Sequence, residues 1–254
     1  MVKKKKYDIV YSLGSNCACA LYLNKHNLRT TSGPFDWVAQ MSFENRIHLI
    51  LNNFTGYLDM SDLKKVTPDN PKEVLKHEIY KHETLGCVFP HDFALNVPLK
   101  QSHREVLKKY RRRIDRFYDN IYRNQKILFV WFSLDGCVTD EEILWASNTL
   151  RKKFNKDIDI VVIEHDEELF NKKMCEKQPN SHSTKITLFA RKLNDTADFT
   201  KGNTKLCGSI FKRYALNKAL IENIKVIVVK TICKLIPIKR YRKQIRSVLL
   251  YGKN

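Results

Sequence analysis

The sequence contains little glycine and little proline, with 8 and 7 of these residues in 254. This composition excludes collagen-like repeats and low-complexity organisation. No run of 18 uncharged apolar residues occurs, so we expect no ordinary transmembrane helix. The basic start at Lys3–Lys6 leads into only a short apolar run without a small-residue cleavage site, so we expect no secretory signal peptide.

Cysteine is also sparse and irregularly placed. The seven cysteines form an odd number, and their spacing shows no repeat. Free thiols in a reducing cytoplasm are the simplest interpretation, and we expect a cytoplasmic protein. A glycine-rich phosphate loop is missing as well, because Gly14 stands alone and no Gly-Lys-Ser/Thr follows it. We therefore expect no bound cofactor.

Hydrophobic residues are plentiful, at 43% of the chain with 11% aromatics, which is enough for a sizeable core. The net charge of +19 is distributed unevenly, since residues 205–254 contain 13 basic residues and one acidic residue. Such a tail favours a polyanionic partner: nucleic acid, anionic lipid or an anionic substrate. Its basic residues alternate with aliphatic residues rather than aromatic ones, which indicates a membrane surface and argues against nucleic acid.

Hydrophobic periodicity predicts an alternation of strands and helices. Strands are expected over 7–13, 126–132, 157–163 and 184–189, with two more between 73 and 89. Helices are expected over 16–27, 42–51, 102–124 and 140–154, with Ser42 capping the second of them and Thr139 the fourth. This order predicts a three-layer α/β domain with a central, mostly parallel sheet. We place this domain at 1–205 and a basic amphipathic tail at 206–254, with helices over 209–221 and 224–236.

The segment Ser12–Cys17 offers the first candidate for chemistry. A strand stops at Gly14, and Cys17 begins the next helix with Ser15 or Asn16 as its N-cap. Unsatisfied N–H groups and the helix dipole stabilise a thiolate there, and the same N–H groups can stabilise an oxyanion. The alternative is that Cys17 is a small buried residue. Cys19 lies 200° around the helix and cannot share its site.

Two further segments, Phe89–Phe93 and Gly33–Trp37, place acidic or basic side chains between aromatic residues. His91 can serve as a general base to Cys17, whereas Asp92 points to the opposite face if the segment is a regular strand. The alternative for His91 is a capped surface turn. Asp36 needs a partner if it is half-buried, and its structural and functional interpretations are evenly balanced.

Other clusters carry weaker signals. His77, His82, Cys87 and His91 match no strong zinc spacing, and we expect no metal site. The basic face at 108–116 is either solvated or receives an anionic substrate. Asp157 and Asp159 have the spacing of a metal-nucleotide motif, but they fall in an expected strand.

Together, Ser-Leu-Gly-Ser-Asn-Cys at 12–17, Gly-Pro-Phe-Asp-Trp at 33–37 and Phe-Pro-His-Asp-Phe at 89–93 resemble a bacterial domain family of unknown function. That family is described as papain-like cysteine peptidases, and the resemblance covers roughly residues 7–165. It implies Cys17 as nucleophile, His91 as base, and Asp36 or Asp92 as the orienting acid. Ser15, Asn16 and Trp37 would then contact the substrate or its oxyanion. The Cys-Gly-Ser-Cys-Trp signature of papain is absent, and Tyr11 stands where papain enzymes place the oxyanion glutamine.

The tail at 235–246 is similar to the C-terminal tails of bacterial capsule and lipopolysaccharide glycosyltransferases. This similarity implies a peripheral position on the inner membrane, near surface-polysaccharide biosynthesis. The sequence thus supports two function classes. The first is a cysteine-nucleophile peptidase, hydrolase or acyltransferase that acts on a peptide, amide or glycan-linked substrate. The second is a glycan-pathway transferase or accessory protein with a nucleotide-sugar or glycan pocket.

Overall fold

A computed structural model describes residues 4–67, 77–133, 138–166, 174–189 and 204–217, together with 228, 229, 231, 233, 241, 245 and 249. The chain divides into two compact units, residues 1–216 and 217–254. The fold and the candidate site below belong to the first unit.

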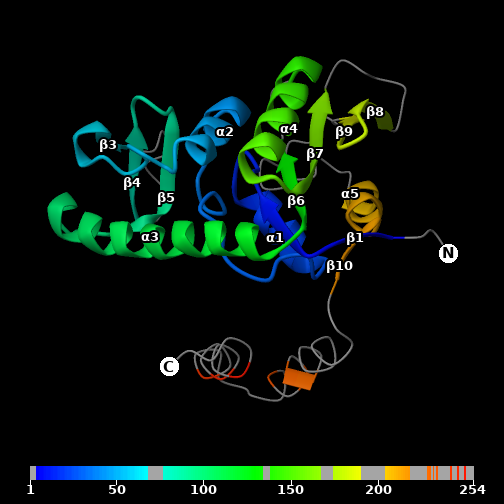
Figure 1. The fold of residues 1–254 in the computed structure, drawn as a ribbon. Coiled ribbons are helices and arrows are strands. Elements are labelled where there is room, and N and C mark those ends of the chain that lie inside the picture. Colours follow the sequence, from blue (N-terminus) through cyan, green and yellow to red (C-terminus); the bar gives the residue numbers. More distant parts are fainter. Residues whose placement is uncertain are drawn as a thin grey trace. The chain divides into compact units, whose positions relative to one another are not determined.

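The centre of the first unit is a five-stranded sheet with the order β2-β6-β7-β9-β8 (Figure 1). Its strands β2, β6, β7 and β9 are parallel, and β8 is antiparallel to β9. Their bounds are Ile9–Ser12 for β2, Lys126–Phe132 for β6, Asp157–Asp166 for β7, Met174–Asn180 for β8 and Ser183–Phe189 for β9. The predicted mostly parallel sheet is confirmed.

Alternate side chains of the central strands enter two separate cores. On β6, Phe129 and Trp131 face the core that is covered by α2 (Phe43–Leu51), α3 (Leu99–Arg123) and α4 (Asp140–Phe154). Val130 and Phe132 face the other core, which is covered by α1 (Cys17–Lys25) and α5 (Thr204–Phe211). Helices on both faces of one sheet give the predicted three layers.

A smaller antiparallel sheet, β3-β4-β5, lies beside α3. It consists of β3 (Leu63–Val66), which follows the short helix η1 (Met60–Asp62), with β4 (His77–His82) and β5 (Cys87–Ala94). The two strands predicted between 73 and 89 correspond to β4 and β5. Phe89 of β5 packs on Tyr57 and Tyr110, so this sheet shares the core of α2, α3 and α4.

Side-chain caps fix where three helices begin. Asn16 caps α1, Ser42 caps α2, and Thr139 forms a capping box with Glu142 at α4. All three starts agree with the sequence prediction. Helix α3 begins three residues earlier than the predicted 102, at Leu99 directly after Pro98.

The structure corrects several predicted elements. The strand predicted over 7–13 is divided at Asp8 into β1 (Lys5–Tyr7) and β2, and β2 is a buried edge strand of the sheet. Strand β8 has no counterpart in the prediction. The helix predicted over 209–221 is wrong beyond Phe211, because Tyr214–Leu216 forms β10 and pairs in parallel with β1.

Helix α5 and β10 belong to the first unit, so the division after Leu216 falls later than the boundary that we drew after Lys205. Cys207, Ile210 and Phe211 of α5 are buried in the second core. Most of the helix predicted over 224–236 lies outside the described residues. Within it, 228, 229, 231 and 233 are helical.

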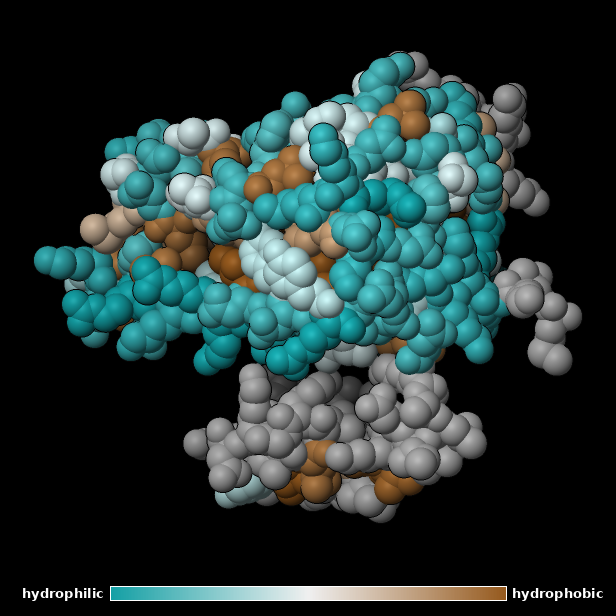
Figure 2. Space-filling model, in the orientation of Figure 1, coloured by the Kyte–Doolittle hydropathy of each residue, from teal (hydrophilic) through white to brown (hydrophobic). Residues whose placement is uncertain are grey.

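The visible surface of the first unit is mostly hydrophilic, with apolar areas between hydrophilic residues (Figure 2). In the part of the chain that the structure describes, every helix is too short or too polar to cross a membrane.

Candidate active site

Cys17 lies where the chain leaves the central sheet. After β2, Leu13 N–H donates to the Val130 carbonyl at 2.7 Å and Ser15 N–H to the Phe132 carbonyl at 3.2 Å, so the turn stays attached to β6. A β-carbon at Gly14 would lie 2.3 Å from that of Cys19, which only glycine avoids. The Asn16 side chain then accepts from Ala18 N–H at 2.9 Å and starts α1. Cys17 is thus the first helical residue, and it is half-buried.

The pKa of the Cys17 thiol differs from the sequence prediction. We expected the helix start to favour a thiolate, whereas burial raises the pKa of the Cys17 thiol above its usual value. Loss of hydration raises this pKa more than the N–H groups of the first helical turn lower it. One of these groups, Ala18 N–H, already donates to the Asn16 side chain. Cys17 is therefore a protonated thiol at neutral pH, and it needs a base to become a nucleophile.

Asp36 is fully buried and is held by neighbours of its own loop. Its Oδ2 accepts from Gly33 N–H at 2.9 Å and from Arg29 Nε at 2.8 Å. Arg29 also donates to the Ser32 hydroxyl at 2.9 Å. Burial raises the pKa of Asp36, and Arg29 opposes that rise. This carboxylate closes the loop that precedes Trp37.

His91 and Asp92 point to opposite sides of β5. His91 is exposed, and its ring meets the rings of Trp37 and His77, each with a centroid distance of 6.2 Å. The Asp92 side chain is buried and accepts from Tyr110 at 2.7 Å and from Lys109. Asp36 and Asp92 are thus bound to other cations and hydroxyls. Within the described ranges, neither carboxylate is hydrogen-bonded to His91.

The segment 37–41 connects the three motifs in space. Gln40 N–H donates to the Ser15 carbonyl at 3.1 Å, and Ala39 pairs with Val88 of β5. Trp37, half-buried, contacts His91 and lies 6.0 Å from the Arg29 guanidinium. The structure therefore gathers the motifs around one segment. As far as the structure describes the chain, Cys17 and His91 share no hydrogen bond, ion pair or ring contact.

Arg46 is a residue that sequence reasoning missed. It is completely buried on α2, and its guanidinium donates to the carbonyls of Ser15, Phe35, Val38 and Met41 at 3.2 to 3.5 Å. The rings of Phe35 and Trp131 lie 5.2 and 5.7 Å from it. Burial lowers the pKa of Arg46 to about 10, so the group stays charged at neutral pH. It fastens the Ser15 turn to the Phe35–Met41 loop.

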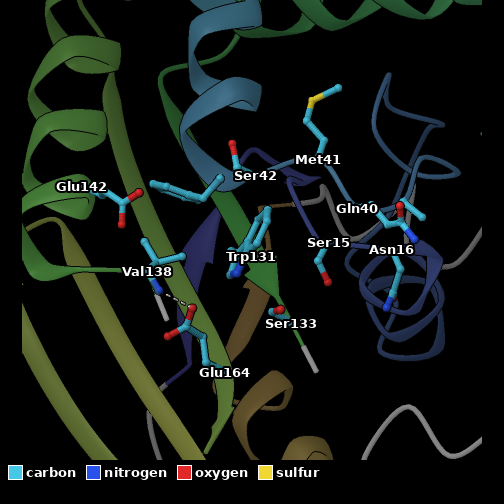
Figure 3. Close-up of a pocket in the computed structure, with 12 residues that line it drawn as sticks. Ser15, Asn16, Gln40, Met41, Ser42, Trp131, Ser133, Val138, Glu142 and Glu164 are labelled. Carbon is cyan, nitrogen blue, oxygen red and sulfur yellow. Dashed lines mark hydrogen bonds between the residues drawn. The ribbon is translucent and has the colours of Figure 1, made fainter. Parts of the chain in front are cut away.

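A cavity of about 480 Å³ opens beside the Cys17 turn, at the carboxyl ends of β2, β6 and β7 (Figure 3). Open α/β sheets place their ligand sites at this edge. We call it the strand-end cavity. Its lining comprises Ser15, Asn16, Ala39, Gln40, Met41, Ser42, Phe43, Trp131, Ser133, Val138, Glu142 and Glu164. Of the predicted substrate-binding residues, Ser15 and Asn16 line it. Trp37 does not belong to this lining.

Glu164 is the buried acid of the strand-end cavity, at 3% exposure. Its Oε1 accepts from Val138 N–H at 2.7 Å, and Lys185 Nζ lies 3.6 Å from Oε2. Burial raises the pKa of Glu164 to about 7. The sequence gives no signal for this residue, because it falls in a strand of mostly apolar character.

The basic face of α3 is partly structural. Lys109 binds Asp92, Arg116 donates to the Ser32 carbonyl at 3.0 Å, and the Arg113 guanidinium lies 4.9 Å from the Tyr110 ring. These cations therefore hold two of the three motif segments, 33–37 and 89–93, against α3. Lys108, by contrast, is exposed and pairs with Glu105 on the helix surface.

Among the described residues, metal-ligating side chains gather at Asp157, Asp159 and His182. Lys5 and Tyr7 already bind Asp159 at 2.8 and 2.6 Å, and Arg151 binds Asp157 at 3.1 Å. This network lies at the start of β7, roughly 20 Å along the strand from Glu164. It serves as an ion-pair network, because basic side chains occupy its carboxylate oxygens.

A family model described as "Putative papain-like cysteine peptidase (DUF1796)" matches residues 8–168. An uncharacterised protein of Acanthamoeba polyphaga mimivirus is 30% identical over 132 residues, which are 47% of this chain and 59% of that relative. The match thus spans less than two thirds of the viral protein. No solved structure matches the chain.

Proposed function

This chain belongs to the family described as papain-like cysteine peptidases, and on that premise we propose that it is a cysteine-dependent hydrolase or acyltransferase. Peptide or amide bonds are the proposed substrates, with Cys17 as nucleophile. The observation that carries this proposal is the position of Cys17. It is the half-buried first residue of α1 at the end of a parallel strand, directly after two residues that line the strand-end cavity.

The proposed reaction begins with proton transfer from the Cys17 thiol to His91. The sulfur then bonds to the substrate carbonyl carbon, and the resulting oxyanion is stabilised by first-turn N–H groups of α1 and by Asn16 Nδ2. Asn16 Oδ1 is engaged by Ala18, which fixes the amide orientation. The protonated base gives its proton to the leaving amine, and water or another acceptor then releases the acyl group.

His91 is the proposed base because its motif adjoins the Cys17 turn through Trp37 and the 39–40 segment. In the proposed scheme the exposed His91 side chain turns toward the thiol and away from its present neighbours, the rings of Trp37 and His77. Asp92 and Asp36 would act indirectly in this scheme. Asp92 fixes β5 on α3, and Asp36 fixes the loop before Trp37.

The test is hydrolysis of a fluorogenic peptide and amide library by the full chain. Cys17→Ala should lower the rate at least a thousandfold and leave the melting temperature within a few degrees, because the thiol is only half-buried. Cys175→Ala is the matched control, since Cys175 is also half-buried but lies on β8. Activity retained in Cys17→Ala would contradict the proposal.

We also propose that the C-terminal unit attaches the protein to an anionic membrane. Residues 217–254 contain ten basic residues and one acidic residue. Tyr241, Ile245 and Leu249 are helical, exposed and four residues apart, so they share one face. An exposed apolar row in a strongly basic segment is typical of interfacial helices. A role in surface-polysaccharide biosynthesis stays a prediction that depends on the tail similarity alone.

A further inference from the structure

The strand-end cavity contains a buried hydrogen-bond donor that finds no acceptor among the described residues. The side chain of Trp131 is 4% exposed, and its Nε1 has no hydrogen-bond partner in the part of the chain that the structure describes. Phe43 packs edge-on against the ring at 5.5 Å, and the Arg46 guanidinium lies 5.7 Å from it, so the indole cannot easily turn to find one. Figure 3 shows the indole nitrogen on the side of the ring toward Ser133 and Glu164. An acceptor supplied by a ligand would satisfy this donor.

Glu164 supplies the complementary acceptor on the same side of the cavity (Figure 3). Val138 N–H donates to its Oε1, whereas within the described ranges the polar neighbour of Oε2 is Lys185, whose Nζ lies 3.6 Å away. A ligand N–H can therefore donate to Oε2. A ligand that meets both residues must offer an acceptor and a donor close together.

The charges around the cavity favour an uncharged ligand. Asn16 and Ser42 are the N-caps of α1 and α2, and Glu142 lies in the first turn of α4, so three positive helix ends meet there. These helix ends oppose a cation. Glu142, together with Glu164 in its ionised form, opposes an anion, because both side chains line the cavity.

We infer that the strand-end cavity binds a carboxamide group of the substrate, such as a glutamine or asparagine side chain. The carboxamide oxygen accepts from Trp131 Nε1, and its N–H donates to Glu164. A cavity of about 480 Å³ accommodates a residue of this size. That this carboxamide belongs to a substrate rests on the proposed function, whereas its binding does not require turnover.

The test observes the Trp131 indole directly by ¹⁵N–¹H NMR on the full chain with Cys17→Ala, which prevents turnover. The chain contains three tryptophans, so three indole signals are expected. The signal that disappears in Trp131→Phe is that of Trp131. The probe is N-acetyl-glutamine methylamide. It should shift the Trp131 indole proton downfield and leave the signals of Trp37 and Trp145 in place.

The comparison ligands are the methionine, glutamate and lysine analogues of the same probe and a disaccharide. The glutamine probe should bind on the order of tenfold more tightly than each, the worth of about one hydrogen bond. Trp131→Phe and Glu164→Gln should each weaken it by a similar factor. Equal binding of the methionine analogue, tighter binding of a charged analogue or the disaccharide, or an unchanged Trp131 signal would overturn the inference. None of these results would alter the expected loss of hydrolysis in Cys17→Ala, so the inference can fail while the proposed function holds.

Discussion

At the scale of single residues, burial decides the chemistry that each group can perform. Cys17 is a thiol at rest because dehydration raises its pKa. Arg46 remains charged inside the core because four carbonyl oxygens and two rings replace water around it. Since Arg46 binds the Ser15 carbonyl, the position of the proposed nucleophile, Cys17, depends on a cation that never contacts solvent.

Glu164 gives a prediction for stability. Its folded pKa of about 7 lies above the ordinary value of 4.5, so the folded state binds more protons between these pH values. The free energy of unfolding should therefore fall as pH rises from 4.5 to 8, by about 3 kcal/mol from this group. Glu164→Gln removes this loss, because glutamine has no proton to release.

Urea denaturation at pH 5 and pH 8 measures the difference. Glu164→Gln should gain stability relative to the wild type by about 3 kcal/mol between the two pH values. Glu105→Gln, at an exposed position, corrects for the general effect of removing one negative charge. A pH-independent difference between wild type and Glu164→Gln would refute the assignment.

At the scale of elements, the C-terminal part of the first unit completes its second core. Helix α5 buries Cys207, Ile210 and Phe211 against the central sheet, and Phe211 stacks on Tyr22 of α1 at 5.5 Å. Strand β10 pairs with β1, whose Lys5 and Tyr7 bind Asp159. The N-terminal strand β1 and the C-terminal strand β10 of the first unit thus stabilise each other.

A chain that ends at residue 203 should therefore be much less stable than one that ends at Asn217. Loss of the burial that Ile210 and Phe211 contribute costs about 4 kcal/mol, which corresponds to a fall in melting temperature of about 10 °C. Thermal unfolding followed by circular dichroism compares the two chains with the full chain. Equal melting temperatures of the two truncated chains would show that α5 and β10 add nothing to the fold.

At the scale of the whole molecule, charge is divided between two units. Residues 217–254 carry a net charge of +9 in 38 residues, whereas the 216 residues of the first unit carry +10, so positive charge is far denser in the second unit. At roughly 1 kcal/mol per basic residue near an anionic membrane, ten such residues suffice for peripheral attachment at low salt.

Co-sedimentation with phosphatidylserine-containing vesicles tests this attachment. The full chain should sediment with them at low salt and detach at high salt, whereas the chain that ends at Asn217 should remain in the supernatant. Ile245→Ser with Leu249→Ser keeps the charge and should weaken binding several-fold, because it removes apolar contacts with the lipid. Equal sedimentation of the truncated and full chains would contradict the proposal.

The sequence by itself determined the elements whose signals are local. Continuous apolar runs predicted β6 and β7, and cap residues predicted the first residues of α1, α2 and α4, because these preferences act within a few residues. Three motifs pointed to Cys17, Asp36 and His91. Only the tertiary structure decided what surrounds these residues, since their neighbours come from distant parts of the chain.

Asp36 and Asp92, both candidates to orient His91, are bound instead by Arg29 and by Lys109 with Tyr110. Trp131 lies inside an apolar run, whereas Arg46 and Glu164 have polar neighbours in the sequence, and no local pattern marks any of the three. The roles of these residues depend on tertiary contacts, because the sheet brings the ends of β2, β6 and β7 together. Burial then determines which hydrogen bonds and which charge each of the three side chains has. Strand β10 likewise exists because β1 offers it a partner across the chain, and this long-range pairing overrides the helical preference of residues 209–221.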